Sequence, residues 1–233
     1  MSTIDQNLQA VRHSIASASC EAGRGPHAVK LLAVSKTFGA DVVLGAVRAG
    51  QTAFGENYLQ EALDKMAVVA AALPGTPLEW HFIGPIQSNK TRLIAEHFDW
   101  VHTVEREKIA QRLSEQRPLG LAPLNICLQV NTSGEISKSG IAPAELAALA
   151  HQVAALPNLA LRGLMAIPEP ALKFEQQRAA FRPLRLLYEQ LRGAGLALDT
   201  LSMGMSADMR AAIVEGATIV RVGSALFGSR DYQ

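Results

Sequence analysis

Short apolar runs alternate along this chain with longer stretches in which apolar residues recur every three or four positions. The short runs are rich in aliphatic and β-branched side chains and predict strands, whereas the longer stretches predict amphipathic helices. Eight runs fit the strand pattern: residues 30–36, 52–56, 79–84, 99–103, 124–131, 160–167, 199–204 and 218–222.

Helical patterns fill the gaps between these runs. One apolar stripe consists of Leu59, Leu63, Met66 and Ala70, and another of Leu146, Leu149, Ala150 and Val153. Residues 41–48, 90–97, 105–117 and 207–215 fit the remaining gaps. A further helix precedes the first strand, with residues 3–6 as a capping box. We expect Pro183 to interrupt the helical stretch 174–192, because proline cannot donate the interior helical bond.

Eight strands alternating with helices, after one extra N-terminal helix, predict an α/β fold: a single (β/α)8 barrel of the TIM type over residues 1–233. An open, doubly wound sheet is the alternative, since it shows the same alternation. The count of eight favours closure, and no GxGxxG motif follows the first strand to indicate a dinucleotide site.

Composition indicates what kind of interior, partners and cellular compartment to expect. Hydrophobic residues make up 48% of the 233 residues and aromatic residues only 5%, which fits an aliphatic interior covered by helices. The 22 basic and 21 acidic residues nearly cancel, so we expect no nucleic-acid partner. The chain has two distant cysteines, no signal peptide pattern and no apolar run of membrane-spanning length, so we expect a cytoplasmic protein without a membrane partner.

Lys36 stands at the end of the first predicted strand, where α/β folds place their chemistry. A lysine close to an apolar floor loses its proton readily and becomes an amine nucleophile that forms imines with carbonyl groups. The same position also suits an ordinary solvated lysine, and this segment alone does not separate the two.

The last two strands end in loops that are typical of a phosphate site. Residues 202–206 read Ser-Met-Gly-Met-Ser, and residues 223–228 read Gly-Ser-Ala-Leu-Phe-Gly. Barrels commonly bind phosphate at these two places, where glycines let backbone N–H groups approach and serines add hydroxyl donors. Ordinary turns, with Ser206 capping a helix, are the alternative.

Two further side chains interrupt apolar strands. Arg221 could lie buried with its N–H donors facing a heteroaromatic nitrogen, or extend outward between helices. His81 could line the barrel, although a core histidine satisfied by neighbours is equally consistent.

The histidines lack metal-ligand spacing, so we expect no metal site. Glu56 suits either a cation partner or a helix cap.

Six blocks of this sequence together resemble a known family. The chain is similar to the pyridoxal phosphate homeostasis proteins (the YggS/PROSC family), which are related to the barrel domain of alanine racemases. The matching blocks are residues 33–36 (AVSK), 54–58 (FGENY), 81–90 (HFIGPIQSNK), 163–167 (GLMAI), 201–206 (LSMGMS) and 221–228 (RVGSALFG).

This resemblance implies that pyridoxal 5'-phosphate (PLP) is held as an imine on Lys36. It also implies three groups of contacts: a phosphate site, a partner for the pyridine nitrogen, and a ring pocket. The cofactor-binding residues would be Ser202, Gly223 and Ser224 for the phosphate, Arg221 for the nitrogen, and Asn57, His81 and Met165 around the ring. The family acts in PLP homeostasis without an established catalytic activity, so we assign no catalytic residue.

Three functions remain at this point: a PLP-holding protein, a PLP-dependent racemase-like enzyme, and a phosphometabolite barrel enzyme. Racemisation by two bases needs an acid or base on each face of the substrate, and the sequence ends at Gln233, soon after the last predicted strand. We therefore expect a monomeric binding protein, with the racemase-like enzyme second. PLP-dependent apoenzymes would be its protein partners.

Overall fold

The structure is a computed structural model that describes residues 2–134 and 138–228. The sequence of residues 133–140 is typical of a loop that could act as a lid, and its residues 135–137 lie outside the described part. The strands are β1 (Lys30–Val34), β2 (Ala53–Glu56), β3 (Glu79–Phe82), β4 (Trp100–Val104), β5 (Leu124–Gln129), β6 (Leu159–Met165), β7 (Thr200–Ser202) and β8 (Ile219–Val222). Each lies within, or within one residue of, a predicted strand.

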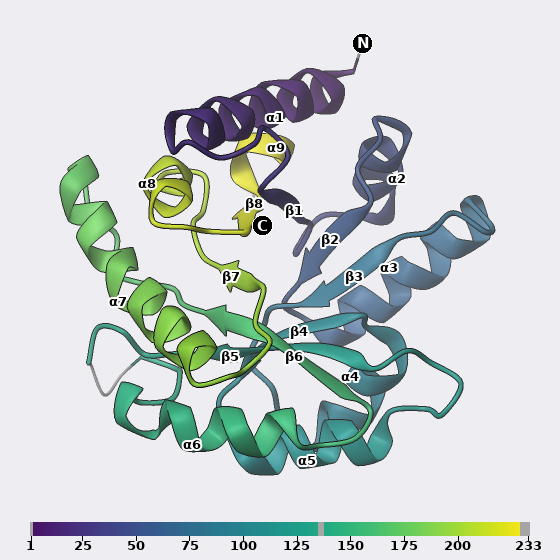
Figure 1. The fold of residues 1–233 in the computed structure, drawn as a ribbon. Helices are drawn as coiled ribbons and strands as arrows, with labels where there is room; N and C mark the ends of the chain where they lie inside the picture. The colour runs from purple at the N-terminus through teal and green to yellow at the C-terminus, as the bar shows by residue number, and fades with distance from the viewer. Residues whose placement is uncertain (1, 135–137, 229–233) are drawn as a thin grey trace.

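The strands form one closed parallel barrel in the order in which they occur along the chain. Closure is made by β1 and β8, where Leu32 lies opposite Arg221. The helices surround the strands (Figure 1). The helices after β1 to β4 are α2 (Ala40–Arg48), α3 (Leu59–Ala72), the short η1 (Ser88–Lys90) with α4 (Thr91–His97), and α5 (Glu107–Gln116). After β5 to β8 come α6 (Pro143–Ala154), α7 (Phe174–Gly193), α8 (Met209–Val214) and α9 (Ser224–Phe227). The predicted barrel is confirmed, and the open sheet is excluded.

Two apolar clusters stabilise the barrel. The larger lies between strands and helices, and side chains such as Phe54, Phe98 and Phe181 are almost fully buried there. The smaller lies inside the barrel and consists of Leu32, Val34, Ala53, Ile83, Trp100, Cys127, Met165 and Ile219. Because successive side chains of a strand point to opposite faces, strands such as β1, β5 and β8 supply both clusters.

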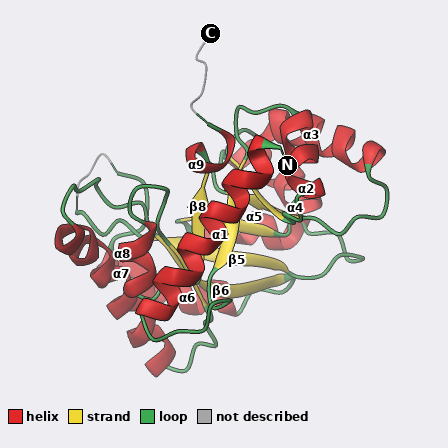
Figure 2. Cartoon of the chain, turned by 90° about the horizontal axis from the view of Figure 1, so that it is seen from above, coloured by secondary structure: helices red, strands yellow, loops and turns green. Residues whose placement is uncertain are grey.

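The additional helix α1 (Thr3–Glu21) lies across α2, α8 and α9 and is seen in front of the barrel in Figure 2. Asn7 Nδ2 donates to the carbonyl oxygen of Leu226 over 3.0 Å and ties this helix to the last one. The helix is capped by Ser2, whose Oγ accepts from the backbone N–H of Asp5. The capping box expected at residues 3–6 is therefore one residue out of register.

Helix α7 runs without interruption through Pro183, contrary to the expectation from sequence. Proline removes the bond to the carbonyl oxygen four residues earlier, on Ala179. Both Pro183 and Ala179 are exposed, so water can solvate that carbonyl group. Phe181 and Leu184 remain buried on the opposite face and hold the helix against the barrel.

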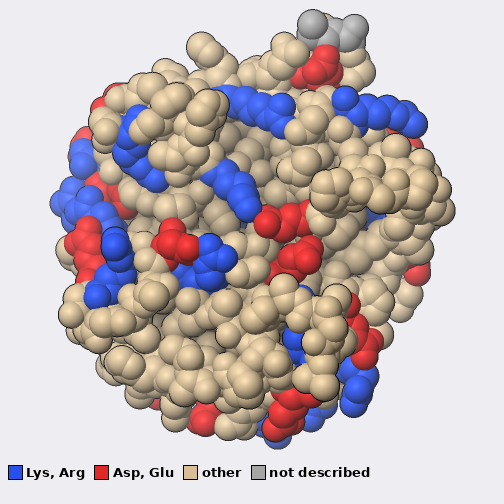
Figure 3. Space-filling model, turned by 45° about the vertical axis from the view of Figure 1, so that its right-hand side comes forward, with Lys and Arg blue, Asp and Glu red and all other residues tan. Residues whose placement is uncertain are grey.

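Charges of both signs are interspersed over the face shown in Figure 3. Within residues 2–134 and 138–228, no helix combines the length and apolar character needed to cross a membrane.

Candidate functional site

Lys36 lies two residues beyond the end of β1, at the carboxyl ends of the strands. It lines a cavity of about 280 Å³ between the ends of β1, β2, β7 and β8. The cavity is lined by Val34, Lys36, Asn57, Ile83, Ile167, Met205, Ser206, Ala207, Arg221, Gly223 and Ser224. Apolar walls with a few polar groups are typical of small-molecule sites.

A buried ion pair holds the segment that carries Lys36. Lys65 Nζ donates to Glu56 Oε1 over 2.6 Å, and to the carbonyl oxygen of Ser35 over 2.7 Å. Ser35 Oγ also donates to Glu56 Oε1, over 2.6 Å. Burial raises the pKa of Glu56, whereas Lys65 and Ser35 stabilise its carboxylate. The backbone on the N-terminal side of Lys36 is therefore fixed by two charged side chains.

Thr37, the residue after Lys36, is held by α3, the helix that carries Lys65. The backbone N–H of Thr37 donates to Glu61 Oε1 over 2.7 Å, and Thr37 adopts a left-handed conformation with φ 68°. Glu61 also accepts from Lys65, at 3.0 Å. A non-glycine residue in this region costs conformational energy, which the bond to Glu61 offsets.

Sequence reasoning missed the role of Lys65. The predicted stripe of α3 was Leu59, Leu63, Met66 and Ala70. Only Leu59 of these is among the buried positions, which are Leu59, Ala62, Lys65 and Val69. A lysine at helical spacing within an apolar row was the available signal, because a buried lysine needs a charged partner. Glu56, which had been considered as a cation partner, is that partner.

Hydroxyl groups and close backbone contacts gather at the β7 and β8 side of the cavity. Ser224 begins α9, and its Oγ lies 3.5 Å from Ser206 Oγ. A Cβ atom on Gly223 would lie 3.2 Å from the carbonyl oxygen of Val34, so this strand end runs close to β1. Asp208 Oδ1 accepts from the backbone N–H of Met205 over 2.6 Å and holds the β7 loop. This side of the cavity can bind an anion.

Arg221 is buried, with 5% of its surface exposed, and borders the same cavity. Its Nη1 donates to Ser202 O over 2.7 Å and to Ser202 Oγ over 2.8 Å, and its Nη2 donates to Ala166 O over 3.0 Å. Desolvation lowers its pKa to about 10, so the guanidinium group stays charged at neutral pH. Three of its five N–H groups thus have partners among the described residues, which leaves two for a ligand.

Asn57 offers a further polar atom. Its Oδ1 is buried and has no hydrogen-bond partner among the described residues. A Cβ atom on Gly84 would lie 2.1 Å from the carbonyl oxygen of Asn57, so glycine is needed there for the two loops to approach. Asn57 also borders an adjoining cavity of about 320 Å³, which includes Thr103 and Gln129. Asn57 therefore lines two neighbouring hollows, which also share Ile83 and Ile167.

The eight predicted cofactor residues fall into two groups. Lys36, Asn57, Arg221, Gly223 and Ser224 line one cavity. The other three do not line it: His81, Met165 and Ser202 are completely buried inside the barrel. The hydroxyl group of Ser202, expected at the phosphate, instead contacts Arg221 Nη1 and His102 Nδ1, both at 2.8 Å. Sequence reasoning had assigned His102 no role.

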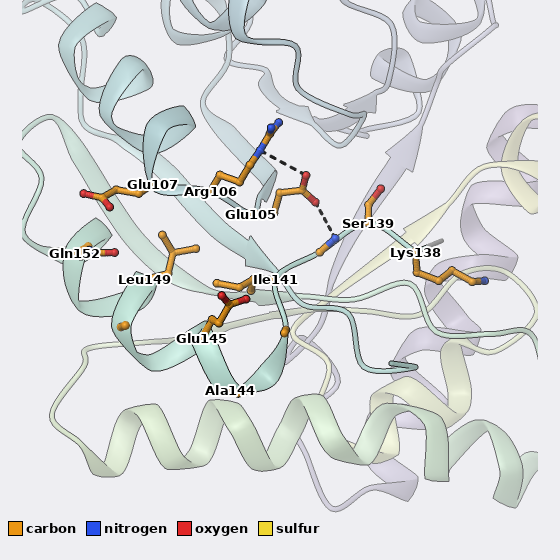
Figure 4. Close-up of a pocket in the computed structure, with 13 residues that line it drawn as sticks. Glu105, Arg106, Glu107, Lys138, Ser139, Ile141, Ala144, Glu145, Leu149 and Gln152 are labelled. Atoms are coloured by element: carbon orange, nitrogen blue, oxygen red, sulfur yellow. Dashed lines mark hydrogen bonds and ion pairs between the residues drawn. The ribbon is translucent and has the colours of Figure 1, made fainter. Parts of the chain in front are cut away.

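A larger hollow of about 830 Å³ lies away from Lys36, between the loop before α6 and the start of α5 (Figure 4). Glu105 Oε2 accepts from the backbone N–H of Gly140 over 2.7 Å, and Arg106 extends beside it. Among the described residues, no cluster of three or more His, Cys, Asp or Glu side chains could hold a metal ion.

Comparison with known proteins gives consistent matches over the whole length. Residues 6–231 match the family described as alanine racemase, N-terminal domain. The chain is 64% identical over 232 residues to a pyridoxal phosphate homeostasis protein of Pseudomonas aeruginosa, covering 100% of this chain and 98% of the relative. It is 53% identical to the protein of that name from Escherichia coli K12, covering 100% and 99%.

Solved structures show the same fold. PipY of Synechococcus elongatus, solved with PLP bound, superposes with a TM-score of 0.83 at 39% identity, over 97% of this chain and 100% of PipY. Alanine racemase of Clostridium difficile superposes with a TM-score of 0.68 at 16% identity, over 88% of this chain and 53% of the racemase. At that identity the racemase is evidence for the fold alone.

Proposed function

This chain belongs to the pyridoxal phosphate homeostasis protein family, and on that premise we propose that it binds PLP at Lys36 and contributes to intracellular PLP homeostasis. The observation that carries the proposal is the shared cavity. It brings a lysine amine, a buried guanidinium group and a serine-lined loop within reach of one small ligand.

The residues around the cavity fit the parts of this cofactor. Lys36 would attach it, while Ser224, Ser206 and the backbone at Gly223 would hold the phosphate. Arg221 would donate to the pyridine nitrogen with its remaining N–H groups. Asn57 Oδ1, buried without a partner among the described residues, would meet a polar substituent of the ring. His81, Met165 and Ser202, buried inside the barrel, would not contact the cofactor but would support Arg221 and the floor of the cavity.

We propose a holding role without strong catalytic turnover. Bound PLP supplies an aldehyde for the Lys36 amine and an electron sink for carbanions, and the sink is weaker when its ring nitrogen stays unprotonated. Arg221, with a pKa of about 10, can only donate to that nitrogen. Among the described residues lining the cavity, Lys36 and Arg221 are the ionisable side chains, so a second acid or base is not at hand.

Attachment can be tested directly. Protein loaded with PLP should show a visible absorbance band, and borohydride followed by peptide mass analysis should place the adduct on Lys36. Lys36→Ala should abolish both, whereas replacing the exposed Lys108 should not. An adduct on another residue, with Lys36 unmodified, would refute the proposal.

The racemase-like alternative needs a separate test. Loaded protein is incubated with enantiopure alanine and serine, and the opposite enantiomer is followed by chiral chromatography. We expect no sustained conversion. Turnover that continues over many equivalents and disappears in Lys36→Ala would establish an enzyme.

The proposal includes a monomeric, cytoplasmic protein that either buffers PLP or gives it to PLP-dependent apoenzymes. Cys20 and Cys127 are unpaired in the structure, which agrees with a reducing compartment. Light scattering after size exclusion tests the monomer. Mixing loaded protein with a PLP-dependent apoenzyme, with and without a PLP scavenger, tests transfer: direct transfer is insensitive to the scavenger.

A further inference from the structure

A line of buried polar side chains crosses the barrel interior from β3 to β8. His81 Nε2 lies 2.7 Å from Glu79 Oε1, and His81 Nδ1 lies 2.8 Å from His102 Nε2. His102 Nδ1 lies 2.8 Å from Ser202 Oγ, which accepts from Arg221 Nη1 over 2.8 Å. Both imidazole rings, the serine and the arginine are almost completely buried. Each nitrogen of the two rings has one partner, so the position of each ring proton depends on its neighbours.

Glu79, at one end of this line, determines which atom donates and which accepts in each hydrogen bond. Glu79 Oε1 also accepts from Lys30 Nζ over 2.6 Å. The hydrogen bonds from His81 and Lys30 lower the pKa of Glu79 to about 2, against the cost of burial, so it is a carboxylate at neutral pH. A carboxylate oxygen 2.7 Å from His81 Nε2 requires a proton on that nitrogen.

If both imidazole rings are neutral, the proton on His81 Nε2 determines the other proton positions. His81 Nδ1 carries no proton and accepts from His102 Nε2–H, which leaves His102 Nδ1 as an acceptor. The Ser202 hydroxyl supplies the proton for His102 Nδ1, so its lone pairs remain for Arg221. Arg221 has only donors, so Ser202 Oγ must accept from it, as the proton positions derived from Glu79 also require.

The reversed arrangement requires a charged ring. If His81 were an imidazolium ion, its Nδ1–H would donate to His102, and His102 Nδ1–H would then donate to Ser202. Burial opposes this by lowering the pKa values of both rings, and for His102 the proximity of His81 and Arg221 adds to the effect. Besides His102, the charged groups of other elements that act on His81 are Lys30 and Asp99, and the ring of Trp100 stacks on it at 5.3 Å.

We infer that Glu79, His81, His102 and Ser202 form a polarised hydrogen-bond relay that holds Arg221 as a fixed donor toward the cofactor cavity. Glu79, His81 and His102 are positioning residues that act through Ser202. The relay joins a partly exposed ion pair, Lys30 with Glu79, to the guanidinium group at the other end. That this group meets the pyridine nitrogen of PLP rests on the proposed function; the proton positions do not.

The proton positions are tested on protein without PLP. Nitrogen-15 NMR at pH 7 distinguishes the two neutral tautomers of histidine and the imidazolium ion. We expect His81 and His102 both to carry the proton on Nε2, with the exposed His27 as the reference signal. A proton on His102 Nδ1, or an imidazolium at His81, would overturn the relay.

Two substitutions at Glu79 test its direction-setting role. In Glu79→Gln the side-chain oxygen still accepts from Lys30 and His81, so both tautomers should persist. Glu79→Met removes the acceptor, so the tautomers should become mixed, and the side-chain N–H groups of Arg221 should exchange with solvent about tenfold faster. Unchanged tautomers and exchange in Glu79→Met would contradict the inference.

Titration with PLP then separates this inference from the proposed function. Glu79→Met should bind PLP about tenfold more weakly and shift its absorbance band, and Glu79→Gln should resemble the unchanged protein. Equal affinity in all three proteins would overturn the positioning role. Failure of the unchanged protein to bind PLP would refute the proposed function, while the tautomer and exchange results would still decide the relay.

Discussion

Lys65 Nζ donates to the carbonyl oxygen of Ser35 over 2.7 Å, one residue before the lysine that borders the cavity. The same ammonium group lies 2.6 Å from Glu56 Oε1, and both charged side chains are buried. A helix after β2 therefore holds the backbone at the end of β1. The position of Lys36 depends on a second lysine that does not itself line the cavity.

Lys65→Met should destabilise the fold and loosen the Lys36 segment. It leaves Glu56 buried without its cation, which costs about 3 kcal/mol or more. Urea unfolding measures the cost. In the protein that remains folded, the yield of Lys36 labelled by PLP and borohydride should decrease.

The double variant Glu56→Gln/Lys65→Met is the control for this prediction. It removes both charges, while the amide oxygen introduced at position 56 could still accept from Ser35 Oγ, so it should unfold at higher urea than Lys65→Met alone. Arg210→Met, which breaks an exposed ion pair with Glu21, should change stability much less. A Lys65→Met protein as stable as the unchanged one would show that the buried pair contributes nothing.

Gly204→Ala should damage the β7 loop through two effects. Gly204 has φ +95°, and an added Cβ would lie 2.5 Å from the Cβ of Ala212. We expect a loss of about 3 kcal/mol in urea unfolding. Its carbonyl oxygen accepts from the backbone N–H of Arg221, so PLP affinity should fall as well.

Gly75→Ala is a matched control for this loop. Gly75 has φ +77°, but no atom of the described residues lies within 4 Å of an added Cβ. Its cost should therefore be the conformational strain alone, about 1 kcal/mol, with PLP affinity unchanged. Equal costs at the two positions would mean that the contact with Ala212 relaxes freely.

Local patterns were sufficient to predict the fold, and they identified part of the site. Strand periodicity located β1 to β8, and the ends of β1 and β8 identified Lys36 and Arg221 because barrels bring strand ends together. Helix ends were less certain: Ser2 and Thr3 both suit a cap, and only backbone geometry distinguishes them.

The relay could not be predicted, because it depends on register between distant strands. His102 and Ser202 are 100 residues apart, and alternation along a strand indicates which face a side chain occupies but not its partner across the barrel. Ser202 was therefore expected at the phosphate from its loop sequence, whereas its hydroxyl lies beside His102.

Ser224→Ala should weaken the binding of PLP but not of pyridoxal. Ser224 Oγ borders the cavity close to Ser206 Oγ, so it can donate to a phosphate that pyridoxal lacks. Loss of one hydrogen bond to a charged group should raise the Kd for PLP about tenfold. Absorbance titration of both ligands measures this, with Ser14→Ala on α1 as the control. An equal effect on both ligands would place Ser224 away from the phosphate.

Folding stability should fall as the solution becomes acidic below about pH 6.5. Burial lowers the pKa values of His81 and His102 in the native protein, so the unfolded chain binds protons that the native state does not. The stabilisation is present above the unfolded pKa of about 6.5 and is lost as the pH decreases. Two such groups contribute a slope of at most about 2.7 kcal/mol per pH unit.

Urea unfolding between pH 5 and 7.5 measures this slope. Glu79 contributes little in most of that range, because its pKa of about 2 and its ordinary value near 4.5 both lie below it. The variant His81→Leu/His102→Leu should lose most of the slope whatever its absolute stability, because it has removed both groups that resist protonation. His97→Gln, at an exposed position, controls for the loss of a histidine from the chain. If the unchanged protein and the double variant had the same slope, the two buried rings could not be the groups that stay neutral in the native state.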